Sequence, residues 1–154
     1  MTGRRSSERV RFLSDVLVTA IEHGGYGFPT CETYEPEPGG DPAGTYAIVA
    51  DRYLQPGDDG YGRTWRVDLD TIARGMAIIR RAFVATDGVP DRCAPGGAGD
   101  AVYVHPDSWE RLYLSHGLRQ QLLAGDRAND AGEFDVIGAL AVLEIALFGA
   151  VVYC

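Results

Sequence analysis

The stretch from Val136 to Cys154 constrains the fold most, because Glu144 is its only charged side chain. A run of 19 residues has the length to cross a bilayer as a helix. A carboxylate near the middle of such a helix, however, costs roughly 2.5 to 3.5 kcal/mol on insertion. Acidic residues precede the run, and no Lys or Arg next to it marks a cytoplasmic side. The sequence therefore predicts a buried helix followed by a short strand over 150–153, and no membrane anchor.

Length and charge bound the class of protein. With 154 residues, of which 45% are hydrophobic, the chain can bury one sizeable core, and no long linker divides it, so we expect a single domain over residues 1–154. The formal net charge is −8, and all 14 basic residues are arginine. Phosphate neutralisation needs clustered basic side chains, so this balance argues against nucleic-acid binding and fits basic partners, or solubility alone, better.

Cysteine usage bears on the compartment. The three cysteines are odd in number and lack the C-x-x-C spacing of zinc and redox sites. They therefore indicate neither a disulfide framework nor a zinc site; they are Cys31, Cys93 and Cys154. The apolar residues after position 11 are interrupted by Ser14 and Asp15, unlike the core of a signal peptide. We expect a cytoplasmic protein.

Apolar spacing predicts two amphipathic helices early in the chain. The first has Ser7 as its predicted N-cap and ends at Gly24 and Gly25. The second follows Asp70 as its N-cap, and its predicted buried face carries Ile72, Met76, Ile79 and Phe83.

Strand signals lie between and after these helices. Residues 28–34, 45–51 and 64–69 read as strands separated by Pro/Gly-rich loops, and 102–104 as a short strand. A third helix is predicted from Pro106 or Asp107 through Trp109, Leu112 and Tyr113, broken by Gly117 before 118–123. With the apolar tail as the fourth helix, the sequence predicts an α+β domain in which a small antiparallel sheet of about three strands packs with four helices.

Several polar groups are candidates for chemistry. Glu22 and His23 are adjacent at a helix end, and Asp68 and Asp70 lie two apart at a strand end, so an enzyme would use these four. Each group also has a simpler interpretation, Glu22 and His23 as a helix stop and Asp70 as a cap. The set of His105, Asp107 and His116 has no usual metal-ligand spacing, and Cys93 in its Gly/Pro-rich loop reads as a bystander. We predict no catalytic residue, metal or cofactor.

Glu144 needs a physical explanation wherever the tail is buried. A carboxylate in an apolar helix must reach the rim of the core, pair with an arginine or take up a proton. The sequence suggests a rim position or an ion pair, with Arg74 or Arg81 as the partner.

Three segments resemble an uncharacterised family of small acidic proteins from actinobacteria and their phages. They are residues 20–34 with Glu22, Gly24, Phe28 and Tyr34, the stretch from Trp65 to Gly75, and the stretch from Ala146 to Tyr153. The chain departs from the family pattern at three positions. His23 replaces a second Gly, Phe28 a Trp and Ala150 a Glu, which puts a role for an acidic group beside Gly149 in doubt. The resemblance implies a phage or mobile-element context and no established activity.

The middle of the chain supplies the leading functional hypothesis. Residues 32–70 hold nine acids against three arginines and many of the aromatic side chains, and aromatic residues in acidic loops suit protein recognition. We therefore expect a non-enzymatic accessory protein that binds another protein through the acidic loops of residues 24–62. The candidate contact residues are Tyr26, Phe28, Tyr34, Glu35, Glu37, Tyr53, Asp58, Asp59 and Tyr61. The alternatives are a structural or homo-oligomeric virion component, the enzyme described above, and an acidic mimic of duplex DNA.

Overall fold

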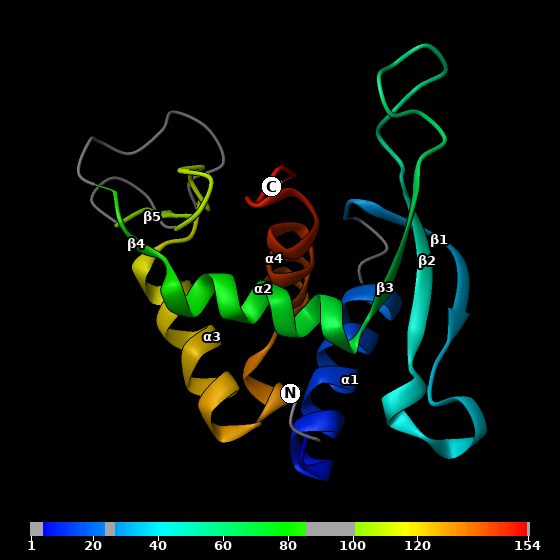
Figure 1. Cartoon of the computed structure of the whole chain (residues 1–154), viewed down its shortest axis with the longest axis horizontal. Coiled ribbons are helices and arrows are strands. Elements are labelled where there is room, and N and C mark those ends of the chain that lie inside the picture. The colour runs from blue at the N-terminus through cyan, green and yellow to red at the C-terminus, as the bar shows by residue number, and fades with distance from the viewer. Residues whose placement is uncertain (1–4, 24–26, 86–100, 154) are drawn as a thin grey trace.

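The computed structural model describes residues 5–23, 27–85 and 101–153, and it confirms the α+β class (Figure 1). The helices in these ranges are α1 (Ser7–Glu22), α2 (Leu69–Arg81), α3 (His116–Ala128) and α4 (Val136–Phe148). The strands are β1 (Pro29–Glu35), β2 (Tyr46–Asp51), β3 (Thr64–Asp68), β4 (Phe83–Val84) and β5 (Tyr103–Val104). β1, β2 and β3 form one antiparallel sheet in that order, and β4 pairs with β5 in a second.

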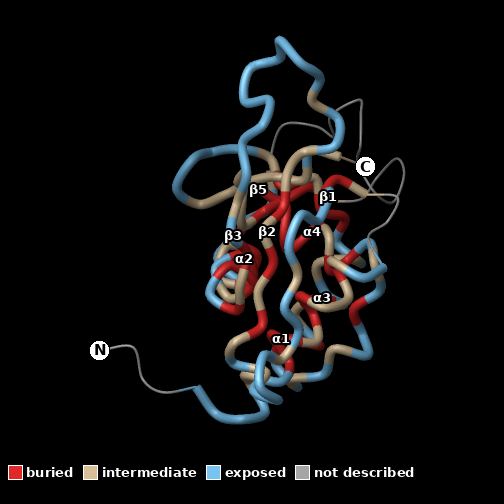
Figure 2. The backbone as a smooth tube through the Cα atoms, turned by 90° about the vertical axis from the view of Figure 1, so that its right-hand side faces the viewer, coloured by how far each residue is buried: buried red, intermediate tan, exposed pale blue. Residues whose placement is uncertain are grey.

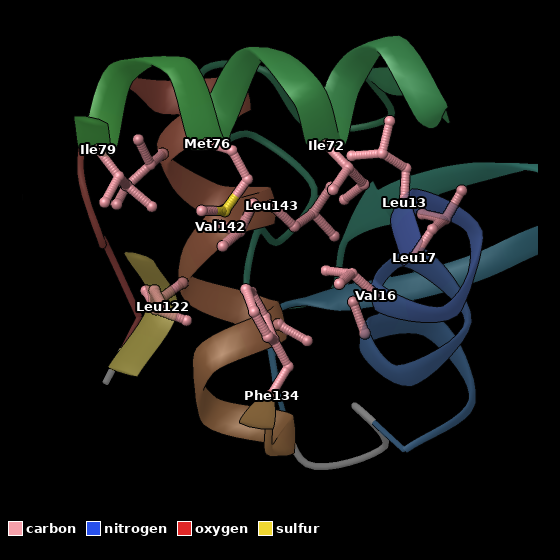
Figure 3. Close-up of a cluster of buried hydrophobic side chains, with 14 of the residues drawn as sticks. Leu13, Val16, Leu17, Ile72, Met76, Ile79, Leu122, Phe134, Val142 and Leu143 are labelled. Carbon is pink, nitrogen blue, oxygen red and sulfur yellow. The ribbon is translucent and has the colours of Figure 1, made fainter. Parts of the chain in front are cut away.

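α4 lies at the centre of the core, as the apolar tail predicted. A helix that is apolar on all sides must be buried on most of them, and α1 and α2 both pack against α4. Figure 3 shows Val142 and Leu143 of α4 among Leu13 and Leu17 of α1 and Met76 of α2. α2 and α4 approach closely at Gly75, where a built Cβ would lie only 2.4 Å from the carbonyl oxygen of Val142. Within the described ranges, every helix falls short of the length and apolarity that a bilayer crossing needs.

The three-stranded sheet has one buried face. Ala47 pairs with Val67, and Val49 pairs with Trp65, so alternate residues of β2 and β3 point toward the helices. Figure 2 shows these strands as partly buried between the helices and solvent. In the β1–β2 ladder, Pro29 lies opposite Asp51 at one end and Glu35 lies opposite Tyr46 at the other. The loop after β1 and the loop after β2 therefore leave opposite ends of the sheet.

Side-chain caps explain where the helices begin. The Ser6 hydroxyl accepts a hydrogen bond from the backbone N–H of Arg9, so Ser6 is the N-cap of α1. Ser7, the predicted cap, is the first residue of the helix. α2 begins at Leu69 because the Asp68 carboxylate accepts from the N–H groups of Asp70 and Thr71, while the Thr71 hydroxyl accepts from the Asp68 N–H. The predicted cap at Asp70 was therefore wrong by two residues.

A buried ion pair ties three helices together. The Asp126 carboxylate of α3 is almost fully buried, and it lies 2.7 Å from the Arg9 guanidinium of α1 and 3.4 Å from that of Arg80 of α2. Arg9 also donates to the Asp126 carbonyl and to the Asn129 side chain. A carboxylate inside a helical core is tolerated because two cations and these hydrogen bonds accompany it.

Besides these caps, the structure corrects three sequence-based expectations. No helix begins at Pro106 or Asp107, because Trp109 and Tyr113 have left-handed φ angles of 62° and 53°, which a right-handed helix cannot contain. Phe83 is not on the buried face of α2 but belongs to β4 and is exposed. Residues 150–153 follow α4 as an irregular segment and not as a strand.

Candidate interaction surface

Three segments gather at one end of the molecule, which we call the loop end. They are the hairpin loop 52–63 between β2 and β3, the β4–β5 strand pair with the loop 105–115 that follows it, and the segment 149–153 after α4. In Figure 1 the hairpin loop projects at the upper right, the β4–β5 region lies at the upper left, and the C-terminal segment lies between them.

The hairpin loop is built from consecutive tight turns. The Asp58 carboxylate accepts from the Gln55 N–H at 2.7 Å, and the Asp58 N–H donates to the Gln55 carbonyl. The next turn follows at once, because the Tyr61 N–H donates to the Asp58 carbonyl at 3.1 Å. Gly57 and Gly60 supply the positive φ angles of 104° and 83° that these turns require. The turns hold the Tyr61 side chain out into solvent, with 55% of its surface exposed.

The loop 105–115 displays Trp109. The His105 Nδ1 atom accepts from the backbone N–H groups of Asp107 and Ser108 at 3.0 and 3.1 Å, so the ring folds the loop back on itself. In the backbone, the N–H of His105 donates to the carbonyl of Glu110, and the N–H of Trp109 donates to the carbonyl of His105. Trp109 is 75% exposed. Its ring packs edge-on against the Phe83 ring, with the two ring centroids 5.6 Å apart.

Segment 149–153 joins the two loops. On one side, the Val151 N–H donates to the Leu112 carbonyl at 3.3 Å, and the Glu110 carboxylate lies against Gly149. On the other side, the Tyr153 ring stacks on Tyr53 with ring centroids 4.8 Å apart. Direct contacts therefore connect the segments of the loop end through residues 149–153.

The C-terminal segment is held by Glu144. The Glu144 carboxylate is buried, with 2% of the residue exposed, and its Oε2 atom accepts from the N–H groups of Val152 and Tyr153 at 2.7 and 2.9 Å. Burial raises the pKa of Glu144 to about 7, against the lowering effect of these two hydrogen bonds. The expected arginine partner was wrong, because Arg74 donates to the Ala146 carbonyl and Arg81 pairs with Asp107.

Exposed apolar side chains are concentrated at the loop end. Seven large hydrophobic side chains of the described residues are exposed, and Ile137, at the start of α4, is the only one away from the loop end. The other six are Tyr53, Tyr61, Phe83, Val84, Trp109 and Val152. Clusters of exposed aromatic and aliphatic side chains on a protein surface are typical of interaction sites.

The predicted contact residues divide between the two ends of the sheet. Tyr53, Asp58, Asp59 and Tyr61 all belong to the hairpin loop at the loop end. Glu35 and Glu37 lie at the opposite end, because Glu35 is the last residue of β1. Glu37 is also ion-paired with Arg11 of α1. The acidic loops of the sequence hypothesis do not form one surface.

The remaining predicted contact residues are placed differently. Phe28 is fully buried and packs edge-on against Trp65 and Phe148, so it is a core residue. The Tyr34 hydroxyl donates to the Glu22 carboxylate, and burial together with this hydrogen bond holds the pKa of Tyr34 well above its usual value. Tyr26 lies outside the described residues.

The candidate catalytic and metal-binding residues are also accounted for. Glu22 accepts from Tyr34, Asp68 caps α2 and Asp70 pairs with Arg5, while His23 is the C-cap of α1. In the described ranges, no three His, Cys, Asp or Glu side chains are grouped as metal ligands. His105 binds its own loop, and His116 Nδ1 lies 2.6 Å from the Tyr103 hydroxyl. Cys93 lies outside the described residues.

Sequence reasoning missed Trp109, Phe83, Val84 and Val152. For Trp109 a signal was present, because His105-Pro-Asp-Ser108 is rich in residues that form turns with their own backbone. These turn-forming residues predict a loop at Trp109, whereas the apolar spacing predicts a helix, and the structure has the loop.

Comparison with known proteins adds no relative: no family model, no curated protein and no solved structure matches the chain.

Proposed function

We propose that the protein is a non-enzymatic binding module that recognises another protein through its loop end. The observation that carries the proposal is the placement of six of the seven exposed large hydrophobic side chains there. Tyr and Trp are the side chains that most often anchor protein interfaces. Trp109 and Tyr61 are held by hydrogen-bonded loops, so little conformational entropy is lost when a partner covers them.

The partner is a different protein with a basic or neutral contact surface. Two copies of a chain with net charge −8 repel each other as they approach. The hairpin loop adds exposed Asp58 and Asp59 beside its tyrosines, which favours cationic groups at the edge of the contact. A phage or mobile-element setting is part of this proposal, and it rests on the resemblance of the three sequence segments.

A photocrosslinking experiment tests the proposal. The photoreactive residue p-benzoylphenylalanine replaces Tyr61 in one variant, Trp109 in a second and Ile137 in a third, each produced in cells that carry the native gene. Ile137 is the matched control, because it is a large exposed hydrophobic residue away from the loop end. We expect the probes at positions 61 and 109 to capture the same protein and the probe at 137 to capture none.

Two other outcomes would reject the proposal. Crosslinks only between copies of the chain would favour the homo-oligomeric alternative, and equal capture from all three positions would show non-specific contact.

The charge contribution has its own test with the captured partner. Replacing Asp58 and Asp59 by Asn should slow association and reduce its salt dependence, because exposed charges steer the encounter. Replacing Glu32 and Glu35 by Gln on the exposed strand β1 removes the same number of charges away from the hairpin loop. This control should leave association nearly unchanged; an equal effect would mean that net charge alone is responsible.

A further inference from the structure

A buried carboxylate links the C-terminal segment to the base of the hairpin loop. The Glu144 Oε2 atom accepts from two successive N–H groups, those of Val152 and Tyr153. The Tyr153 hydroxyl donates to Oδ2 of Asp51, the last residue of β2. Oδ1 of the same carboxylate accepts from the Tyr53 N–H at 2.9 Å, which fixes the first turn of the hairpin loop. One chain of hydrogen bonds therefore runs from Glu144 to Tyr53.

Ring stacking follows the same route. The Tyr153 ring lies parallel to Phe28, with centroids 5.6 Å apart and an interplanar angle of 1°, and it also stacks on Tyr53. Removing segment 150–153 from Glu144 would take away both the stacking partner of Tyr53 and a hydrogen-bond donor of Asp51.

We infer that Glu144 and segment 150–153 form a proton-dependent clasp, in which protonated Glu144 keeps the segment in place and ionised Glu144 promotes its release and loosens the base of the hairpin loop. Its effect on partner binding rests on the function proposed above, whereas the clasp itself does not.

The surroundings of Glu144 determine the direction of the effect. The buried residues of α1 and α2, which pack on α4, include no titratable side chain, and their only polar side chains are the hydroxyls of Ser14 and Thr71. The charged and titratable groups near this end of α4 are Asp51, Tyr153, Arg74, Glu110 and His105. Asp51 raises the pKa of Glu144 further, and no cation is paired with Glu144 among the described ion pairs.

The size of the effect follows from linkage. In the clasped state burial holds the pKa of Glu144 at about 7, and release exposes the carboxyl to water, where its pKa returns to about 4.5. Protons are then bound more tightly in the clasped state, so the equilibrium constant for release rises with pH, by about tenfold from pH 6 to pH 8. Below pH 4.5 both states are protonated, and above pH 7 both are ionised, so the change is confined to this window.

Solution NMR can test the clasp on the unchanged protein. Titration of the ¹³C-labelled Glu144 carboxyl should give a pKa near neutrality. Hydrogen exchange of the Val152 and Tyr153 N–H groups, divided by the intrinsic rate at each pH, should give opening constants about tenfold larger at pH 8 than at pH 6. The Tyr53 N–H should follow the same trend. A carboxyl that titrates near 4.5, or opening constants equal at the two pH values, would overturn the inference without any variant.

Two variants separate the proton switch from its transmission. Glu144→Gln keeps an acceptor for the two N–H groups but cannot ionise, so the pH dependence of Val152 opening should vanish. Tyr153→Phe keeps the stacked ring but loses the bond to Asp51. Val152 should then still respond to pH, and Tyr53 should no longer follow it. A Tyr53 response equal to that of the unchanged protein would refute transmission through Asp51.

Binding measurements distinguish the clasp from the proposed function. A captured partner whose affinity differs between pH 6 and pH 8, with the difference lost in Glu144→Gln, supports both. A pH response of Val152 with no partner captured at positions 61 and 109 leaves the clasp standing and rejects the proposed function. Specific capture at those positions without a pH response of Val152 rejects the clasp alone.

Discussion

Replacing Gly75 by Ala should destabilise the protein, although alanine is the better helix former. Gly75 lies in the middle of α2, where Ala is favoured over Gly by about 1 kcal/mol in an isolated helix. The added Cβ would lie 2.4 Å from the Val142 carbonyl oxygen, 3.0 Å from the Val142 Cγ1 atom and 3.2 Å from the Ala146 Cβ. The nearest of these neighbours is backbone, which cannot move aside by changing a rotamer.

The magnitude follows from the shift that the methyl group forces. An ordinary carbon–oxygen contact is about 3.3 Å, so α2 would have to move from α4 by roughly 0.9 Å at this point. Overpacking of this kind costs about 1 to 3 kcal/mol. After the gain in helix propensity is subtracted, we expect a net loss of up to about 2 kcal/mol, which lowers the Tm by up to roughly 8 °C.

Gly117 provides the matched control. It lies in the first turn of α3, and a Cβ built there meets nothing within 4 Å. Gly117→Ala should therefore raise the free energy of unfolding by up to about 1 kcal/mol. Urea denaturation followed by circular dichroism gives both free energies. If Gly75→Ala stabilises the protein as much as Gly117→Ala does, the close approach of α2 and α4 is wrong.

Three further predictions use the same measurement. Leu143→Ala, in the fully buried part of α4, should cost about 2 to 5 kcal/mol, whereas Ile137→Ala at the exposed start of that helix should change the free energy by about 0.5 kcal/mol or less. Asp126→Asn should lower the free energy of unfolding by about 3 kcal/mol, because it leaves Arg9 and Arg80 without their buried anion. Asp107→Asn, which breaks an exposed ion pair, should lower it by less than about 1 kcal/mol. Equal losses in the two variants would contradict the burial of Asp126. The raised pKa of Glu144 means that the folded state holds a proton that the unfolded state has lost between pH 4.5 and 7. Stability should therefore fall by about 2 kcal/mol or more from pH 5 to pH 8, and this component should be absent in Glu144→Gln.

The elements that could be predicted from the sequence are those in which local pattern and tertiary environment agree. Val136–Phe148 has apolar side chains on every side, with Glu144 as its only charged one, so most of it must be buried. The alternation in Trp65-Arg-Val67 fits a sheet with one buried face. In residues 105–115 the local pattern and the tertiary contacts disagree. Trp109, Leu112 and Tyr113 have helical spacing, but the hydrogen bonds to His105 Nδ1 and the pairing of Val104 with Arg111 set a different backbone. Spacing alone does not reveal such competition.

The candidate surface was predictable only in part for a related reason. Tyr53, Tyr61, Asp58 and Asp59 were assigned to one exposed loop because their segment is acidic, aromatic and rich in turn-forming residues, and the structure places all four in the hairpin loop. Glu35 and Glu37 were grouped with them because they are close in sequence, but strand β2 carries the chain from one end of the sheet to the other between the two loops. Val152 and the environment of Glu144 depend on contacts between residues distant in sequence, such as Tyr153 with Asp51.

The central position of α4 also has a consequence for biosynthesis. α4 follows every other helix and strand of the fold along the chain, yet α1 and α2 bury their apolar faces against it. A ribosome that adds about 5 to 20 residues per second needs roughly 3 to 13 seconds to proceed from the end of α2 to the end of α4. During this interval the nascent chain carries the apolar stripes of α1 and α2 without their central packing partner, so the ribosome-bound protein should depend on holding chaperones until α4 has emerged.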